Sequence, residues 1–287
     1  MVTPAARRDA VRHLQAHFAV SERHACRLVG VSRSTVRYQS CPQQDDTELR
    51  SRLCRLARER PRFGSRRLHA LLRREGYRVN RNWVHRLYRE EELTLKRRRR
   101  KRVARPRGSA PTSAVQPNVT WYLDFVHDRV ASGRAFRTLG VIDRCTREAL
   151  AIGVDTSLPG ARIVRLLERL GQERGQPTEI VLDNGPELTG QVLDQWASQH
   201  GVRLHFIEEG KPTQNAVMES FNGRFRDECL NSHWFTSLAD ARQIIEAWRM
   251  DYTSERPHSS LGYATPNEAH RRKTGHAPVL DAAGLSQ

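Results

Sequence analysis

Long hydrophobic runs are missing from this 287-residue sequence. No stretch approaches the ~18–20 apolar residues of a membrane-spanning helix, so we expect no membrane partner. The N-terminus is polar and has no secretory-signal pattern, and the five cysteines are scattered without a CxxC pair. An odd number of separated cysteines favours reduced thiols, which predicts a cytoplasmic protein.

Lysine is also scarce, because arginine supplies most of the 49 basic residues, which outnumber 32 acidic residues for a net charge of +17. Residues 1–118 hold 30 basic and 10 acidic residues, whereas residues 119–287 hold 19 and 22. Solubility alone does not require such segregation. Because the arginine guanidinium donates two parallel hydrogen bonds to phosphate, the basic part favours a nucleic-acid partner.

The first 44 residues are predicted to form a helix-turn-helix region. Ser21 and Ser32 can cap two short helices, and Gly30 marks the turn between them. Any small helical hairpin would share this pattern, but it suits DNA binding. The apolar residues spaced to pack the helices together are Ala25, Leu28, Val31 and Val36. The candidate DNA contacts at the start of the second helix are Arg33, Ser34, Thr35 and Arg37.

Residues 45–95 are predicted to form a second helical, helix-turn-helix-like DNA-binding region. SRRLHALLRREG is amphipathic and ends at Gly76, and RNWVHRLYREE has an apolar side that includes Trp83 and Tyr88. These aromatic residues suit a core better than a base-stacking surface. The residues of the first segment that we expect to face inward are Leu68, Leu71 and Leu72.

Residues 96–118 are predicted to form a basic linker. Seven consecutive cations are followed by a segment rich in Pro, Ser and Ala. The run could be solvated, but bringing like charges together is costly without an anion, which favours contact with DNA. The candidate contacts are Arg97, Arg98, Arg99, Arg100 and Lys101.

The pattern changes to strands at residue 119. Three apolar segments predict a meander, after which helices and strands alternate up to a helix that ends near Cys229. The order β-β-β-α-β-α-β-α predicts an α/β unit over residues 119–235, with a mixed five-stranded sheet and flanking helices. This order is compatible with the ribonuclease-H-like fold. Residues 236–287 are expected to form a C-terminal helical extension and tail.

Three acidic residues are candidates for catalysis. Asp124 stands in the middle of the apolar strand TWYLDFV, where a buried carboxylate is costly unless it is paired or bound to a cation. Asp183 ends the predicted strand EIVLD, at the kind of strand end where α/β proteins build sites. Each has an ordinary alternative, because Asp124 could pair with an arginine and Asp183 could be a turn residue.

Glu219 is predicted on a helix whose apolar stripe contains Val217, Phe221 and Phe225. Because it is two residues from both neighbours on that stripe, it lies on the other side of the helix. That side could be solvated or could face DNA. The residues that share it are Asn215, Asn222, Gly223 and Arg226.

The combination of these segments is specific. The sequence contains the motifs WYLDF, LDNGPE and KPTQNAVMESFNGRFRDECLNSHWF, and 35 residues separate Asp183 from Glu219. In these motifs and this spacing the chain resembles the OrfB transposases of the insertion-sequence-three family. Those proteins have a retroviral-integrase-like core with a D,D(35)E motif. WRMDYTSERPHSSLGYATPNEA is similar to the family's C-terminal signature. The helical region before residue 96 is also similar, so the resemblance covers about residues 7–270. Leu182 and Leu188 stand where the family commonly has Ser and Phe, and both changes leave the three acidic residues in place.

The resemblance implies a DNA transposase that cuts the ends of a bacterial insertion sequence and joins them to target DNA. Asp124 would bridge two Mg²⁺ ions, with Mn²⁺ able to substitute, and Asp183 and Glu219 would each hold one. The residues expected to position DNA beside the metals are Lys211, Asn215, Asn222 and Arg226.

The resemblance also implies several partners. These are the element's terminal repeats and target DNA, a second copy of the chain on that DNA, and fusion to an upstream-frame protein. A bacterial, nucleoid-associated location follows. The alternatives are an inactive, DNA-binding relic or regulator, and a ribonuclease of the same fold. A zinc site at His13, His17, Cys26 and Cys41 is disfavoured, because 14 residues separate the two cysteines.

Overall fold

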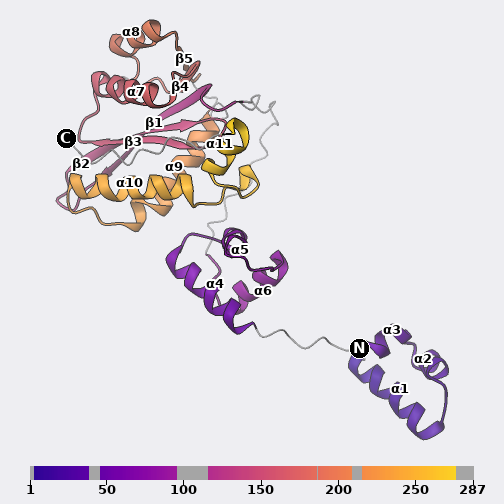
Figure 1. The fold of residues 1–287 in the computed structure, drawn as a ribbon. Coiled ribbons are helices and arrows are strands. Elements are labelled where there is room, and N and C mark those ends of the chain that lie inside the picture. The colour runs from indigo at the N-terminus through magenta and orange to yellow at the C-terminus, as the bar shows by residue number, and fades with distance from the viewer. Residues whose placement is uncertain (1–2, 39–45, 96–115, 186, 209–214, 276–287) are drawn as a thin grey trace. The chain divides into compact units, whose positions relative to one another are not determined.

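The computed structural model describes residues 3–38, 46–95, 116–185, 187–208 and 215–275. The chain forms two compact units, Met1–Arg52 and Leu53–Gln287 (Figure 1). Among the described residues, no helix is long and apolar enough to cross a membrane.

The first unit is helical, as the sequence predicts. It contains α1 (Pro4–Phe18), α2 (Glu22–Val29) and α3 (Arg33–Arg37). Ser21 and Ser32 accept hydrogen bonds from the backbone N–H groups of the first turns of α2 and α3, and Gly30 ends α2 in the left-handed conformation.

The prediction that Leu28 packs in the core of this unit is wrong. Leu28 is 62% exposed, whereas Val11, Ala25 and Cys26 form the buried cluster, with Val29, Val31 and Val36 packed against it. Ala25, Cys26 and Val29 define one side of α2. At 100° per residue, Leu28 lies about a quarter-turn or more away from the centre of that side.

The second unit begins with more helices. α4 (Thr47–Glu59) extends across the boundary between the units and is followed by α5 (Ser65–Arg74) and α6 (Arg81–Glu90). Leu68 and Leu72 are fully buried, and Leu71 is half-buried. Tyr88 is buried and Trp83 is half-buried, in agreement with their interpretation as core residues.

The mixed sheet that the sequence predicts is present. β1 (Thr120–Arg129), β2 (Ala135–Asp143) and β3 (Ala149–Asp155) form an antiparallel meander, and β4 (Glu179–Leu182) and β5 (Arg203–Phe206) add parallel strands on the other side of β1. The strand order is β3-β2-β1-β4-β5. The predicted succession of elements along the chain, β-β-β-α-β-α-β-α, is confirmed.

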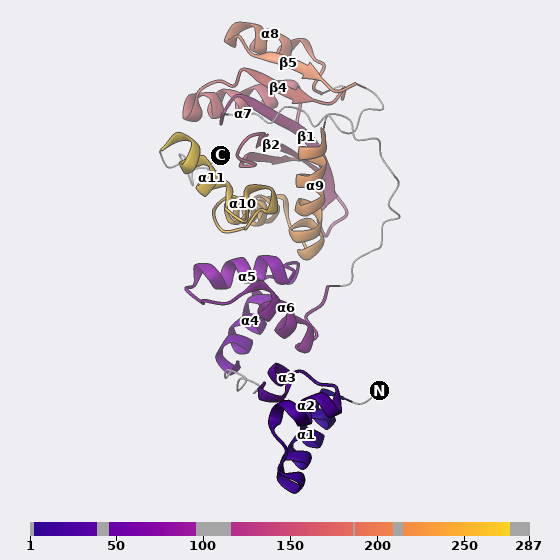
Figure 2. The ribbon, with the colours of Figure 1, turned by 90° about the vertical axis from the view of Figure 1, so that its right-hand side faces the viewer.

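Helices cover both faces of this sheet (Figure 2). One buried cluster joins Trp121 and Leu123 of β1 to α7 (Gly160–Arg174) and α8 (Gln191–His200). The other joins Tyr122 and Val126 to α9 (Ala216–Glu228) and α10 (Leu238–Ser254). Because successive side chains of a strand alternate between faces, Asp124 is on the α9 face of β1.

Polar contacts of buried groups join the C-terminal extension to the rest of the second unit. Glu148, before β3, accepts a hydrogen bond from Arg174 at 2.5 Å and lies 3.5 Å from the Nδ1 of His270 in α11 (Pro266–Thr274). Arg249 of α10 donates to the carbonyl of Ala149 at 2.9 Å. The extension is therefore part of the second unit's packing.

Candidate active site

The first candidate carboxylate, Asp124, is half-buried at the centre of the sheet. It lies opposite Gly140 of β2 in the antiparallel register. Its Oδ1 accepts a hydrogen bond from the backbone N–H of Phe125 at 2.8 Å, and its Oδ2 accepts one from the Nδ2 of Asn222 at 2.8 Å. Both oxygens are therefore held in fixed positions by the fold.

The second carboxylate, Asp183, follows the last residue of β4. Tyr122 of β1 is level with Val181 of β4, so continuing this parallel register places Asp183 level with Asp124. Asn184 donates to the carbonyl of Ile207 at 3.2 Å, which ties this strand end to the end of β5. Gly185 donates to Asp183 at 3.2 Å, and a Cβ at Gly185 would lie only 3.1 Å from the Oδ1 of Asp183.

The third carboxylate, Glu219, is exposed in the first turns of α9. Met218 and Phe221, on either side of it in sequence, are buried against the sheet. Gly140 allows this approach, because a Cβ there would lie 3.0 Å from the Cε of Met218. An isolated glycine within a strand pattern is the signal that could have predicted the contact.

The charges of Asp183 and Glu219 act on Asp124. Burial raises the pKa of Asp124, the negative charges of Asp183 and Glu219 add to the rise, and the hydrogen bonds from Phe125 and Asn222 oppose it, with a resulting value of about 6. Among the described residues, none of the three forms an ion pair with a basic side chain. The alternative that Asp124 is paired with an arginine is therefore not what the structure shows.

The donor chemistry of this set fits a divalent cation. Carboxylate oxygens are the hard ligands that Mg²⁺ prefers, and a half-buried carboxylate beside two others lacks a compensating positive charge. However, within the described ranges no three His, Cys, Asp or Glu side chains are arranged as a ready metal-binding group. The three side chains come near one another without forming a closed set of ligands.

Predicted DNA contacts in α3 differ in their surroundings. Arg33 and Ser34 are exposed. Thr35 is half-buried, with its hydroxyl 2.7 Å from that of Ser32. Arg37 makes a bidentate ion pair with Glu22 of α2, which raises the pKa of Arg37 and lowers that of Glu22. Arg37 is thus already engaged in joining α3 to α2.

Predicted contacts near the carboxylates lie along α9. Asn215 immediately precedes the helix, Asn222 holds Asp124, and Arg226 is exposed one turn farther on. The predicted contacts Lys211 and Arg97, Arg98, Arg99, Arg100 and Lys101 lie outside the described residues.

Sequence reasoning missed the supports of the site. Arg137 of β2 makes an ion pair with Glu187, which lowers the pKa of Glu187 in the loop after Asp183. Leu182 and Leu188, the two departures from the family's pattern, are both fully buried in the core on the α7 and α8 face. They therefore fill the core beside the site and do not enter it.

Comparison with known families identifies two kinds of domain in the chain. Residues 114–212 and residues 200–266 each match an integrase core domain, and residues 44–102 match an HTH-like domain. The second match spans the end of the sheet, α9, α10 and the segment before α11, so it includes residues 248–266 of the predicted C-terminal signature.

The chain is also similar in sequence to proteins of bacterial insertion elements. The chain is 49% identical over 265 residues to the insertion element IS407 uncharacterized 31.7 kDa protein of Burkholderia multivorans, covering 91% of this chain and 95% of that protein. It is 28% identical over 245 residues to the transposase InsD for insertion element IS2A/D/F/H/I/K of Escherichia coli, covering 80% of each.

The fold is also shared with a solved structure. The simian T-cell lymphotropic virus intasome, solved in complex with PP2A regulatory subunit B56 gamma, matches with a TM-score of 0.51 at 14% identity, over 82% of this chain and 80% of that chain. Such a likeness shows a common ribonuclease-H-like fold. The insertion-element relatives and the integrase-core matches show that the chain belongs to the insertion-sequence-three family of OrfB-type transposases.

Proposed function

We propose that this transposase uses Asp124, Asp183 and Glu219 to cleave the ends of its insertion element and to join them to target DNA. The observation that carries the proposal is the carboxylate of Asp124. It is half-buried on the integrase-core sheet, close enough to Asp183 and Glu219 for their charges to raise its pKa, and it lacks a basic partner among the described residues. That arrangement is stabilised by a divalent cation.

The chain's own residues would prepare this site for metal and DNA. Asp124, Asp183 and Glu219 would together hold two Mg²⁺ ions, or Mn²⁺ ions in their place. When bound, the ions would supply an activated nucleophile and neutralise charge on the leaving oxygen. Asn222 and the N–H of Phe125 keep the Asp124 oxygens oriented. The Asn184 hydrogen bond fixes the strand end that carries Asp183.

DNA would be bound by the helical and basic regions before the core. Arg33 and Ser34 are exposed at the start of α3, and residues 44–102 match an HTH-like domain. Arg226 extends the exposed side of α9 beyond Glu219. Bringing two element ends together would require a second copy of the chain on the DNA, and an upstream-frame fusion partner could add further end recognition.

The test is a cleavage and joining assay with a duplex from the DNA that flanks the protein's own gene. Wild type is compared with Asp183→Asn and with the matched control Asp194→Asn, an exposed carboxylate on α8. We expect Mg²⁺-dependent nicks and joined strands from wild type and from the control. Asp183→Asn or added EDTA should abolish both products.

Other outcomes separate the alternatives. Salt-sensitive DNA binding without nicks, even from a fusion to the upstream frame, would show a DNA-binding relic or regulator and overturn the proposal. Cleavage of an RNA–DNA hybrid without strand joining would show a ribonuclease. Products that persist in Asp183→Asn would remove this carboxylate from the site.

A further inference from the structure

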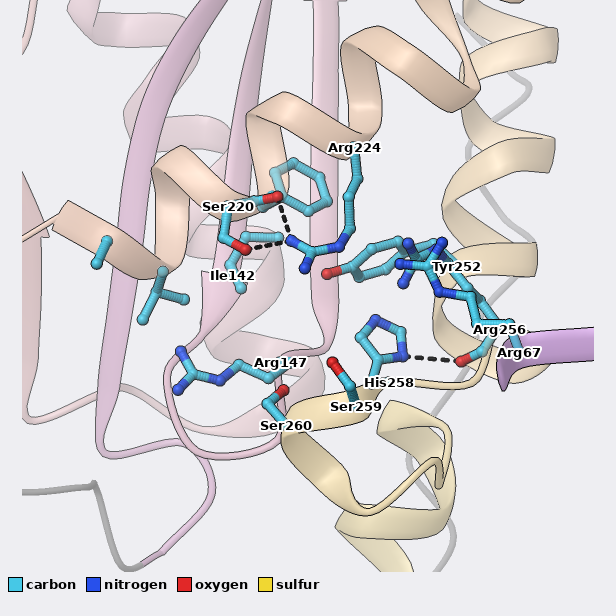
Figure 3. A pocket seen from close by; sticks show the side chains of 13 residues that line it. Arg67, Ile142, Arg147, Ser220, Arg224, Tyr252, Arg256, His258, Ser259 and Ser260 are labelled. Carbon is cyan, nitrogen blue, oxygen red and sulfur yellow. Dashed lines mark hydrogen bonds between the residues drawn. The ribbon is translucent and has the colours of Figure 1, made fainter. Parts of the chain in front are cut away.

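A cavity of about 200 Å³ lies beside α9, which lines it with Val217, Ser220, Phe221 and Arg224. This is far more than the ~10–15 Å³ that one water molecule occupies by the same kind of measure. Figure 3 shows Ser220 and Arg224 of α9, Arg147 from the turn after β2 and His258 from the segment after α10 around it. Arg67 of α5 and Arg256 also line it.

The arginines around this cavity outnumber the carboxylates that contact them. Glu228 accepts hydrogen bonds from Arg256 at 2.6 Å through both of its oxygens, and it accepts one from Arg67 at 3.2 Å. Arg224 donates to the carbonyl and hydroxyl of Ser220, which are neutral groups. Within the described residues, the guanidinium of Arg147 forms no hydrogen bond and no ion pair.

The excess positive charge affects the groups around it. Burial and the charge of Arg256 lower the pKa of Arg67 to about 10 and also lower the pKa of Arg224. The same two causes lower the pKa of His258 to about 3. Like charges that are collected and partly desolvated in this way are stabilised by an anion.

His258 adds a polar atom without a partner. It is only 5% exposed, and its Nδ1 lies 2.8 Å from the carbonyl oxygen of Arg256. Because a carbonyl oxygen can only accept, the proton of the neutral imidazole is on Nδ1. Among the described residues, the buried Nε2 has no hydrogen-bond partner, which is unusual unless a ligand or bound water satisfies it.

We propose that this cavity, which we name the arginine pocket, binds a phosphate group of the DNA strand that passes the three carboxylates. This rests on the proposed function. Ser220 directly follows Glu219, and Arg224 lies five residues after Glu219, so these two pocket residues stand about 100° and about 140° around α9 from Glu219. Arginine suits this task because its planar guanidinium matches phosphate oxygens in two parallel hydrogen bonds.

The test measures phosphate contacts without requiring catalysis. The full chain is titrated with a labelled duplex in EDTA between about 50 and 200 mM salt, and the slope of log K against log salt is measured. Arg147→Gln is compared with Arg169→Gln, a half-exposed arginine of α7 whose only close carboxylate is Glu173 at 3.9 Å among the described ion pairs. We expect Arg147→Gln to reduce the slope by about 1 and the control to leave it unchanged.

A second variant and a second measurement guard against misfolding. Arg224→Gln should also reduce the slope, and both pocket variants should keep the cooperative thermal unfolding of wild type. A dinucleotide with one phosphodiester should raise the Tm of wild type and of Arg169→Gln more than that of Arg147→Gln, because a ligand stabilises only the state that binds it.

Failure of this proposal is distinct from failure of the proposed function. If wild type nicks and joins DNA but both pocket variants retain its salt slope, the pocket does not contact phosphate. If the pocket variants lose slope while wild type never cleaves in Mg²⁺, the pocket binds DNA and the catalytic proposal fails. A wild type that shows neither DNA binding nor dinucleotide stabilisation would overturn the pocket.

Discussion

Two different sides of α9 carry opposite charge. On one side, Glu219 lies near Asp124 and Asp183 without a basic partner among the described residues. On the other, Arg224 belongs to the arginine pocket, whose ion-paired carboxylate is Glu228. In each place the fold collects like charge and partly excludes water from it, although both arrangements cost free energy in the absence of a ligand.

The difference lies in how each side is compensated. The carboxylates are held by neutral donors, the Phe125 N–H and the Asn222 amide, which orient Asp124 without cancelling its charge. The arginine pocket contains a true counter-ion, because Glu228 is bound by Arg256 through two hydrogen bonds. The acidic side is therefore left open for a cation, whereas the basic side is partly neutralised and keeps room for one more anion. Variants that remove single charges can test this comparison.

The largest expected effect comes from removing the counter-ion of the arginine pocket. Glu228→Gln would leave Arg256, which is 1% exposed, and Arg67 without a carboxylate. Breaking a buried ion pair from one side typically costs about 3–5 kcal/mol. We expect a fall of that size in the free energy of unfolding, measured by urea denaturation at neutral pH.

A matched variant on α7 gives the control. Glu173→Gln removes a carboxylate that lies 3.9 Å from Arg169 in a half-exposed pair, for which we expect a loss below about 1 kcal/mol. Equal losses in the two variants would show that Glu228 does not compensate the pocket.

A smaller effect is expected when the support of the acidic side is removed. Asn222→Ala would release one oxygen of Asp124, and loss of such a partner of a metal ligand typically costs about 10–100-fold in metal affinity or activity. The rate of strand cleavage, measured against Mg²⁺ concentration, should recover in part at high Mg²⁺. DNA binding in EDTA should be unchanged.

This experiment also separates two roles for Asn222. The sequence predicts it as a DNA contact, and in that case the variant would weaken binding in EDTA and would not recover at high Mg²⁺. Asn231→Ala, an exposed asparagine beyond the end of α9, should match wild type in both measurements.

The third prediction concerns the stability of the metal-free protein. The pKa of Asp124 is raised to about 6 by burial and by neighbouring carboxylates, so its ionisation costs stability as the pH rises through 6. At pH 7.5 in EDTA, Asp124→Asn should therefore raise the free energy of unfolding by about 1–3 kcal/mol while abolishing cleavage.

The gain should disappear below the unfolded-state pKa, near pH 3.8, because Asp124 is then protonated in both states. Asp194→Asn, an exposed carboxylate, serves as the control and should change little at either pH. A destabilised Asp124→Asn at pH 7.5 would show that its hydrogen bonds outweigh the cost of its charge.

Much of the fold could be predicted from the sequence because the strands and helices have clear periods. The apolar run TWYLDFV predicted a strand, and the parallel and antiparallel pairing of β1 confirmed the mixed sheet. Ser21, Gly30 and Ser32 marked helix ends in agreement with α2 and α3. The prediction that Leu28 is buried was wrong because the short helix has apolar residues on more than one side, and periodicity did not decide which side was buried.

A residue of the site could be predicted only where its type is unusual for its position in the sequence. An aspartate within an apolar strand signalled Asp124, but its partner Asn222 is 98 residues away and only packing brings them together. The arginine pocket could not be predicted from the sequence for the same reason. Arg67, Arg147 and Arg256 come from distant segments, and each resembles an ordinary surface arginine in the sequence. The C-terminal signature was visible, but its part in lining a pocket was not.

The smallest predicted effect comes from the histidine of the arginine pocket. Burial and the charge of Arg256 lower the pKa of His258 to about 3, so the neutral ring stabilises the folded state above the unfolded pKa of 6.5. That stability is lost as the pH falls below 6.5, because His258 then binds a proton in the unfolded chain but stays neutral in the folded chain. His258→Asn keeps a donor for the Arg256 carbonyl and does not titrate. Between pH 7.5 and 5.5, wild type should lose about 1 kcal/mol more of its unfolding free energy than this variant. Parallel pH profiles would mean that the ring becomes protonated in the folded state, and the arginine pocket would then hold less positive charge than the structure indicates.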